Sequence, residues 1–184
     1  MNKILADMHT HTIASGHAYA TLTEMCKEAA NKGLEIYGIT EHSSGIPGTC
    51  ADLYFKNLGV VPRDLFGLDL RLGAEINIID YNGTLDLGQE YIDRLDFVIA
   101  GIHSVCYKFG SKEENTAAII NAIKNPNVNI ISHPDDGRCP LDYEALVQAA
   151  KEYHVLLEIN NNALRDKNRK NVKENRKTER CMTS

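Results

Sequence analysis

The sequence predicts an α/β fold in which parallel strands alternate with helices, and three observations carry this prediction. Short apolar runs alternate with segments of helical pattern along the chain. Two of the helical segments open with a capping box. Six of the seven histidines come at or just after the end of an apolar run. Strands that alternate with helices pair in parallel through right-handed crossovers, and 184 residues are most simply one domain.

The helices are justified by their start and stop signals. Thr21 with Glu24 and Ser111 with Glu114 form the two capping boxes, Gly33 ends the first helix, and Asn125-Pro126 ends the helix that starts at Ser111. In chain order, helices are expected at residues 21–33, 53–58, 88–95, 111–124 and 142–153.

The strands are justified by apolar runs bounded by turn residues. A loop rich in Gly, Ser and Pro covers residues 43–50, and Asn82-Gly83 favours a tight turn because both residues tolerate positive φ. Strands are expected at residues 4–8, 36–39, 70–79, 97–102, 128–132 and 155–159.

The stretch Asp7-Met8-His9-Thr10-His11 follows the first of these strands. In an extended segment, residues two apart point to the same side, so His9 and His11 can present two imidazoles to one point. That arrangement suits a metal ion, although two histidines in a loop at a strand end give the same pattern.

The other histidines favour the metal. Loops that follow parallel strands lie on one face of an α/β fold, so residues distant in sequence converge there. Glu75 is a carboxylate among Ala74, Ile76 and Ile78, and its burial is costly unless it is paired or coordinated. Imidazoles are expected on this face at His9, His11, His17, His42, His103 and His133, whereas His154 is expected at a helix end.

Composition narrows the function classes. The net charge of −5 argues against nucleic acid as a partner. The N-terminus lacks a basic start and a continuous apolar core, and no apolar run is long enough to span a bilayer, so we expect a cytoplasmic protein without membrane association. The five cysteines form no CxxC pair and are expected to be reduced thiols.

Five motifs together resemble the polymerase and histidinol phosphatase (PHP) superfamily, and within it the YcdX-like phosphatases. The resemblance covers about residues 3–162. The motifs are Asp7-Met8-His9-Thr10-His11-Thr12 with His17, Thr40-Glu41-His42-Ser43, Gly73-Ala74-Glu75-Ile76-Asn77, Gly101-Ile102-His103-Ser104 and Ile131-Ser132-His133-Pro134-Asp135.

The resemblance implies a distorted (β/α)7 barrel, similar to a TIM barrel, over residues 1–165. At its carboxyl face it implies a centre of up to three Zn²⁺ ions, with Mn²⁺ or Fe²⁺ as alternatives. His9, His11 and Glu75 would hold one ion, Glu75 would share a second with His103 and His133, and the third would take His17 and His42. Catalysis would depend on His9, His11, Glu75, His103 and His133.

The sequence departs from the family in two places. Glu41 stands where the family usually has Asp, which retains a carboxylate. The family also continues beyond residue 162 with a helix and a strand that ends in Asp-x-His. Here residues 166–184 read as a polar, basic helix and tail without an apolar strand.

We therefore expect the barrel to lack its last strand-helix portion, and two of the three metal sites each to lose a ligand. An open sheet edge favours lower stability or pairing with a second copy of the chain.

The resulting hypothesis is a metal-dependent phosphatase that hydrolyses small phosphomonoesters with a water activated by several metal ions. Asp7 and Asp135 are candidates to orient imidazoles, and Asp7 is equally suited to a purely structural role. A histidinol-phosphate phosphatase and a catalytically impaired metal-binding remnant remain as alternatives. A structural domain whose histidines only form hydrogen bonds is a third.

Overall fold

The computed structural model describes residues 4–160, which form two compact units. The first unit contains residues 4–76 and 86–99, and the second contains residues 77–85 and 100–160. The chain passes from one unit to the other within strand β4 (Leu68–Asn77), between residues 85 and 86, and within strand β5 (Phe97–Gly101).

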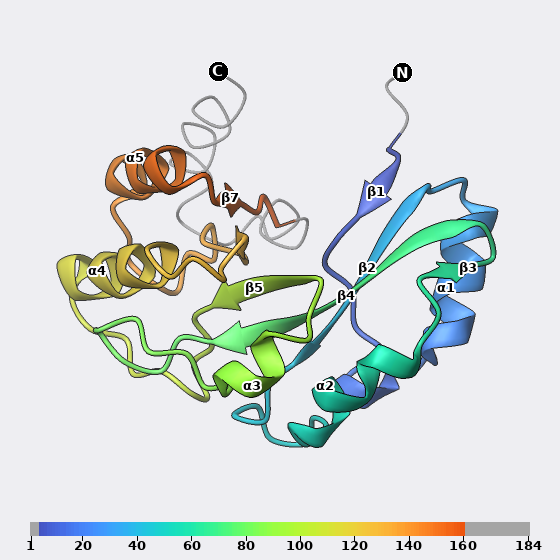
Figure 1. Cartoon of the computed structure of the whole chain (residues 1–184). Coiled ribbons are helices and arrows are strands. Elements are labelled where there is room, and N and C mark those ends of the chain that lie inside the picture. The colour runs from blue at the N-terminus through green and yellow to red at the C-terminus, as the bar shows by residue number, and fades with distance from the viewer. Residues whose placement is uncertain (1–3, 161–184) are drawn as a thin grey trace. The chain divides into compact units, whose positions relative to one another are not determined.

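Parallel strands form the centre of the first unit. Strand β1 (Ala6–Asp7) pairs with β2 (Ile36–His42), and β2 pairs with β4 in a register that places His42 beside Glu75. Strand β5 follows β4 in this order. Because strands β2 and β4 end at the same edge, the residues at their carboxyl ends lie side by side (Figure 1).

The helices of the first unit begin where the sequence predicts. Helix α1 (Leu22–Asn31) has Thr21 as its N-cap, and the reciprocal hydrogen bonds with Glu24 complete the capping box. The shorter elements are the 3₁₀ helices η1 (Ile13–Ser15) and η2 (Leu58–Val60) and the helices α2 (Leu53–Asn57) and α3 (Gln89–Ile92).

Strand β3 (Asp64–Leu65) was not predicted. It pairs antiparallel with the start of β4 through a two-residue turn in which Phe66 and Gly67 both have positive φ, 57° and 78°. Such turns normally carry Asn-Gly or Asp-Gly, and a phenylalanine at the first position gives no recognisable turn signal.

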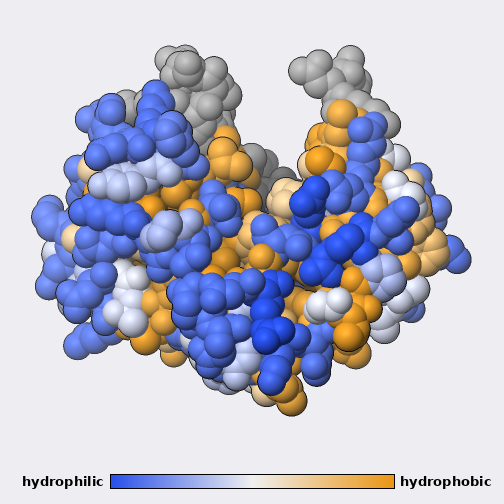
Figure 2. All heavy atoms as spheres, in the orientation of Figure 1, coloured by the Kyte–Doolittle hydropathy of each residue, from blue (hydrophilic) through white to orange (hydrophobic). Residues whose placement is uncertain are grey.

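In the second unit, the end of β5 is followed by β6 (Ile130–Ile131) and β7 (Leu156–Leu157), and β6 and β7 are parallel. Helices α4 (Lys112–Ile123) and α5 (Tyr143–Tyr153) pack side by side (Figure 1). Their buried faces carry small and aliphatic side chains, and Figure 2 shows hydrophilic atoms over much of their outer surface.

The prediction of an α/β fold with parallel strands is confirmed, and all six predicted strands and five predicted helices are present. Strands β1, β6 and β7 are shorter than predicted, with two residues each. The predicted tail at residues 166–184 lies outside the described residues. Within residues 4–160, none of the helices combines the length and the apolar character needed to cross a membrane.

Candidate metal centre

The segment after β1 is fixed to β2 by main-chain contacts. Thr40 donates its N–H to the carbonyl of Thr10 at 2.9 Å, and the Thr10 hydroxyl donates to the carbonyl of Gly38 at 2.6 Å. A Cβ on Gly38 would lie 2.7–2.9 Å from the main chain of Met8, so the close approach requires glycine at position 38. These contacts determine where the neighbouring His9 and His11 lie.

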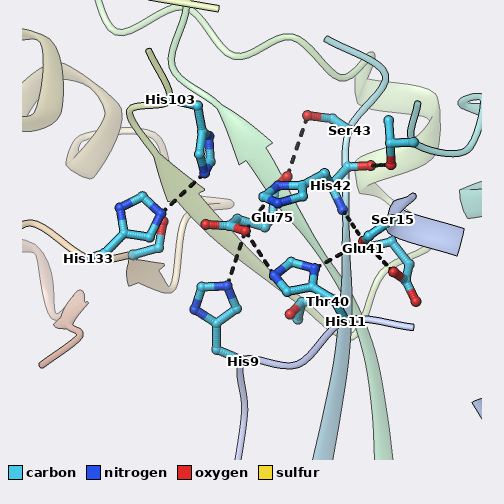
Figure 3. Close-up of polar contacts among 12 residues, drawn as sticks. His9, His11, Ser15, Thr40, Glu41, His42, Ser43, Glu75, His103 and His133 are labelled. Carbon is cyan, nitrogen blue, oxygen red and sulfur yellow. Dashed lines mark hydrogen bonds and ion pairs between the residues drawn. The ribbon is translucent and has the colours of Figure 1, made fainter. Parts of the chain in front are cut away.

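Glu75 is the centre of the first unit's polar cluster. Glu75 is 1% exposed, because the neighbouring residues of strand β4 are buried on both faces of the sheet. Glu75 Oε2 lies 3.1 Å from His9 Nε2, 3.3 Å from His11 Nε2 and 3.1 Å from His42 Nδ1 (Figure 3). Three imidazoles from two separate segments of the chain therefore face one buried carboxylate oxygen.

Two sets of ligand atoms in this unit have the spacing of a metal site. His9, His11 and Glu75 form one set, and His11, His17 and His42 form the other, with the atoms of each set within 4.8 Å of one another. The His17 ring centroid is 4.9 Å from that of His11 and 4.9 Å from that of His42. Imidazole nitrogen with carboxylate oxygen is a donor set that suits zinc and also manganese or iron.

A second carboxylate, Glu41, lies next to His42 and is fully buried. It accepts hydrogen bonds from the main-chain N–H of Thr12 at 3.1 and 3.2 Å, from the Thr12 hydroxyl at 2.5 Å, and from the Ser15 hydroxyl. These bonds hold the η1 turn against the end of β2, so Glu41 organises the loop that carries His11 and His17.

The second unit brings His103 and His133 together. Their Nε2 atoms are 3.2 Å apart. Figure 3 marks this contact with a dashed line. A Cβ on Gly101 would lie 3.4 Å from the His103 ring and 3.3 Å from the His133 ring, so the two imidazoles pack over a residue without a side chain. His133 has a positive φ of 33°, and its N–H donates to Glu158 Oε2 at 2.7 Å, which holds this unusual backbone conformation.

The two aspartates proposed as orienting groups lie in different surroundings. Asp7 is exposed and accepts a hydrogen bond from the main-chain N–H of His9 at 3.4 Å, not from an imidazole. Asp135 is buried and accepts from the main-chain N–H of Asn160 at 3.0 Å, and burial raises the pKa of its carboxyl to about 6.

The structure thus places the sequence-predicted residues in two groups. His9, His11, His17, His42 and Glu75 meet in the first unit, and His103 and His133 meet in the second. His154 is exposed at the C-terminal end of α5, as predicted.

The sequence did not predict the buried Ser15 or the hydrogen bonds that Thr12 and Ser15 donate to Glu41. Glu41 did carry a signal, since it is a carboxylate at the end of an apolar run. Ser15, by contrast, lies in a polar loop where the sequence gives no indication of burial.

Comparisons with known proteins show which family the chain resembles. The PHP domain profile matches residues 7–165. A probable phosphatase of Acetivibrio thermocellus is 48% identical over 161 residues, which cover 88% of this chain and 67% of the relative. A probable phosphatase of Caldicellulosiruptor saccharolyticus is 50% identical over 167 residues, which cover 90% and 70%. The chain spans about two thirds of the length of these curated relatives.

A solved structure shares the fold. It is a crystal structure of histidinol phosphate phosphatase from Lactococcus lactis subsp. lactis, complexed with zinc, L-histidinol and phosphate. The TM-score is 0.50 at 17% sequence identity, and the match covers 84% of this chain and 72% of that chain.

Proposed function

Because the chain belongs to the PHP domain family, we propose that it is a metal-dependent phosphatase that hydrolyses small phosphomonoesters. The observation that carries the proposal is the buried Glu75 carboxylate faced by the nitrogens of His9, His11 and His42 at 3.1–3.3 Å. A carboxylate in such a position needs a compensating positive charge, which a divalent cation supplies. The names of the relatives, probable phosphatases, support a hydrolase.

Each group of ligands has a distinct part in this proposal. His9, His11 and Glu75 would hold one cation, and His17 with His42 would hold another. His103 and His133 provide two further imidazole ligands. Bound divalent cations would neutralise the phosphate, lower the pKa of a water and stabilise the leaving oxygen. Zinc is the proposed ion, since the histidinol phosphate phosphatase that shares the fold contains zinc, with manganese and iron as alternatives.

The nearby hydroxyl groups do not act as nucleophiles in this proposal. The Ser15 hydroxyl donates to Glu41, and the Ser43 hydroxyl donates to Asp86 Oδ1 at 2.5 Å. Glu41 thereby holds the η1 turn in place, and Asp86 holds the loop that follows His42. The attacking group is therefore water.

The substrate class is a small phosphomonoester, and histidinol phosphate is the specific alternative. The solved structure that shares the fold is a histidinol phosphate phosphatase, so histidinol phosphate belongs in the panel of test substrates. Sugar phosphates, nucleoside monophosphates and p-nitrophenyl phosphate complete the panel. A preference for histidinol phosphate of more than about tenfold in kcat/KM would identify the alternative, because tenfold corresponds to about 1.4 kcal/mol of transition-state discrimination.

The test combines metal content with turnover. The purified chain is stripped with a chelator, titrated with Zn²⁺ or Mn²⁺, and assayed on the panel. Glu75→Gln should weaken metal binding by at least about 10–100-fold, the loss usually seen when only an outer partner of a ligand is removed. The matched control is Glu28→Gln, which replaces an exposed carboxylate paired with Lys32 on the surface of α1.

Three results would contradict the proposal. They are a chain that binds no metal, a Glu75→Gln variant with wild-type turnover, and a metal-loaded chain without turnover on any phosphomonoester. The last would identify the metal-binding remnant instead.

A further inference from the structure

The network around Glu41 has a direction that follows from which atoms carry hydrogen. A carboxylate only accepts, and a main-chain N–H only donates. Both oxygens of Glu41 accept from the N–H of Thr12, and Oε1 also accepts the hydroxyl hydrogen of Thr12. The Thr12 oxygen in turn accepts from the N–H of Ala14 at 3.2 Å. The hydroxyl hydrogen of Thr12 is therefore directed at Oε1, and Oε2 accepts the hydroxyl hydrogen of Ser15.

Ser15 then has no hydrogen left to donate. Its Oγ has two further neighbours, the main-chain N–H of His42 at 3.2 Å and Nδ1 of His11 at 3.0 Å. The main-chain N–H of His42 can only donate, so Ser15 Oγ accepts from it. Because the single Ser15 hydrogen is directed at Glu41, the contact with His11 is a hydrogen bond only if His11 Nδ1 carries a hydrogen. Ser15 is 1% exposed, so water does not offer an alternative partner.

We propose that Glu41 and Ser15 are positioning residues that fix His11 in the tautomer with its hydrogen on Nδ1. The other ring nitrogen, Nε2, is the atom that lies 3.3 Å from Glu75 Oε2. In this tautomer its lone pair is directed at the Glu75 oxygen, and two lone pairs face each other in a buried site. A cation bound by both atoms would relieve that repulsion. The hydrogen-bond relay from Glu41 through Ser15 to His11 therefore prepares His11 to act as a ligand.

Replacement of Glu41 by glutamine should reverse the relay. The amide has one acceptor and one donor end. Its oxygen must remain at Oε1, where the N–H and the hydroxyl of Thr12 both donate. The amide NH₂ then faces Ser15 and donates to it, which releases the Ser15 hydrogen to His11 Nδ1. His11 is driven to the tautomer with hydrogen on Nε2, which cannot bind a metal through that nitrogen.

The tautomer is measured directly by long-range ¹H–¹⁵N NMR of the histidine rings. The spectra are recorded on the metal-free chain at about pH 9, above the range in which imidazoles titrate. Loss of signals in His11→Gln assigns the ring. We expect hydrogen on Nδ1 in the wild type, on Nε2 in Glu41→Gln, and a shift toward Nε2 in Ser15→Ala. Asp7→Asn is the control, because Asp7 contacts a main-chain N–H, and it should leave the tautomer unchanged.

Zinc affinity provides the second readout. Glu41→Gln should bind zinc about 10–100-fold more weakly, the usual loss for a partner of a metal-binding histidine. The ligand role of His11 rests on the proposed function, but the tautomer does not. A wild-type chain that binds no zinc overturns the proposed function while the NMR result stands. Hydrogen on Nε2 in the wild type, or an unchanged tautomer in both folded variants, overturns the relay itself. Circular dichroism establishes that the variants are folded, and Ser15→Ala tests the relay if Glu41→Gln is not.

Discussion

Substitution of Gly101 by alanine tests how the imidazole pair of the second unit is packed. An added Cβ would lie 2.1 Å from the Ser132 hydroxyl oxygen, 3.3 Å from the His133 ring and 3.4 Å from the His103 ring. Ser132 is 2% exposed, so its side chain has little space in which to rotate away from the new methyl group. The strand end or the two rings must therefore move.

The size of the effect follows from this crowding. Insertion of a methyl group into a packed interior costs about 1–3 kcal/mol. For a chain of 150–250 residues, each kcal/mol lowers Tm by about 2–4 °C, so Gly101→Ala should melt about 2–12 °C below the wild type. Because the rings of His103 and His133 limit the space, the same change should also weaken metal binding at this pair.

The assay is thermal unfolding followed by circular dichroism, with two companion variants. Gly59→Ala is the matched control: it lies in η2, and its added Cβ meets nothing within 4 Å, so its Tm should equal or slightly exceed that of the wild type. Gly101→Ala combined with Ser132→Ala removes the closest contact and should recover part of the loss. A Gly101→Ala variant that melts like Gly59→Ala would show that the reasoning from packing is wrong.

Three further predictions concern stability and reactivity. Hydrogen bonds from Thr84 lower the pKa of Asp80, so the ionised carboxylate stabilises the fold above about pH 4, and this stabilisation is lost as the pH falls through the lowered pKa. In urea titrations, Asp80→Asn should therefore lower the free energy of unfolding at about pH 7 but not at about pH 2. Burial raises the pKa of the Cys50 thiol to about 11, so iodoacetamide at pH 8 should label Cys50 slowly in the folded chain and rapidly in urea. Peptide mass spectrometry measures the two labelling rates, and equal rates would contradict the prediction. Ser111→Ala removes the hydroxyl that accepts from the N–H of Glu114 and should cost about 1 kcal/mol in urea unfolding, whereas an unchanged midpoint would show that the cap contributes little.

Local signals in the sequence predicted the order and type of the elements. The capping boxes at Thr21 and Ser111 start α1 and α4 as expected, since a cap depends only on residues three positions apart. The hairpin of β3 was missed because Phe66 adopts a positive φ that its residue type does not suggest. Short strands such as β6 were predicted too long, because an apolar run marks burial and not the extent of pairing.

The sequence by itself determined which side chains are available as ligands, because the spacing of His9 and His11 and the apolar surroundings of Glu75 are local properties. Only the tertiary structure decided how those side chains are held. The bond from Ser15 to Glu41 joins residues 26 positions apart, and the contact between His42 and Glu75 depends on the register of β2 against β4. Contacts of this kind arise from strand pairing and loop closure, which no short stretch of sequence encodes, and they give each histidine a defined partner.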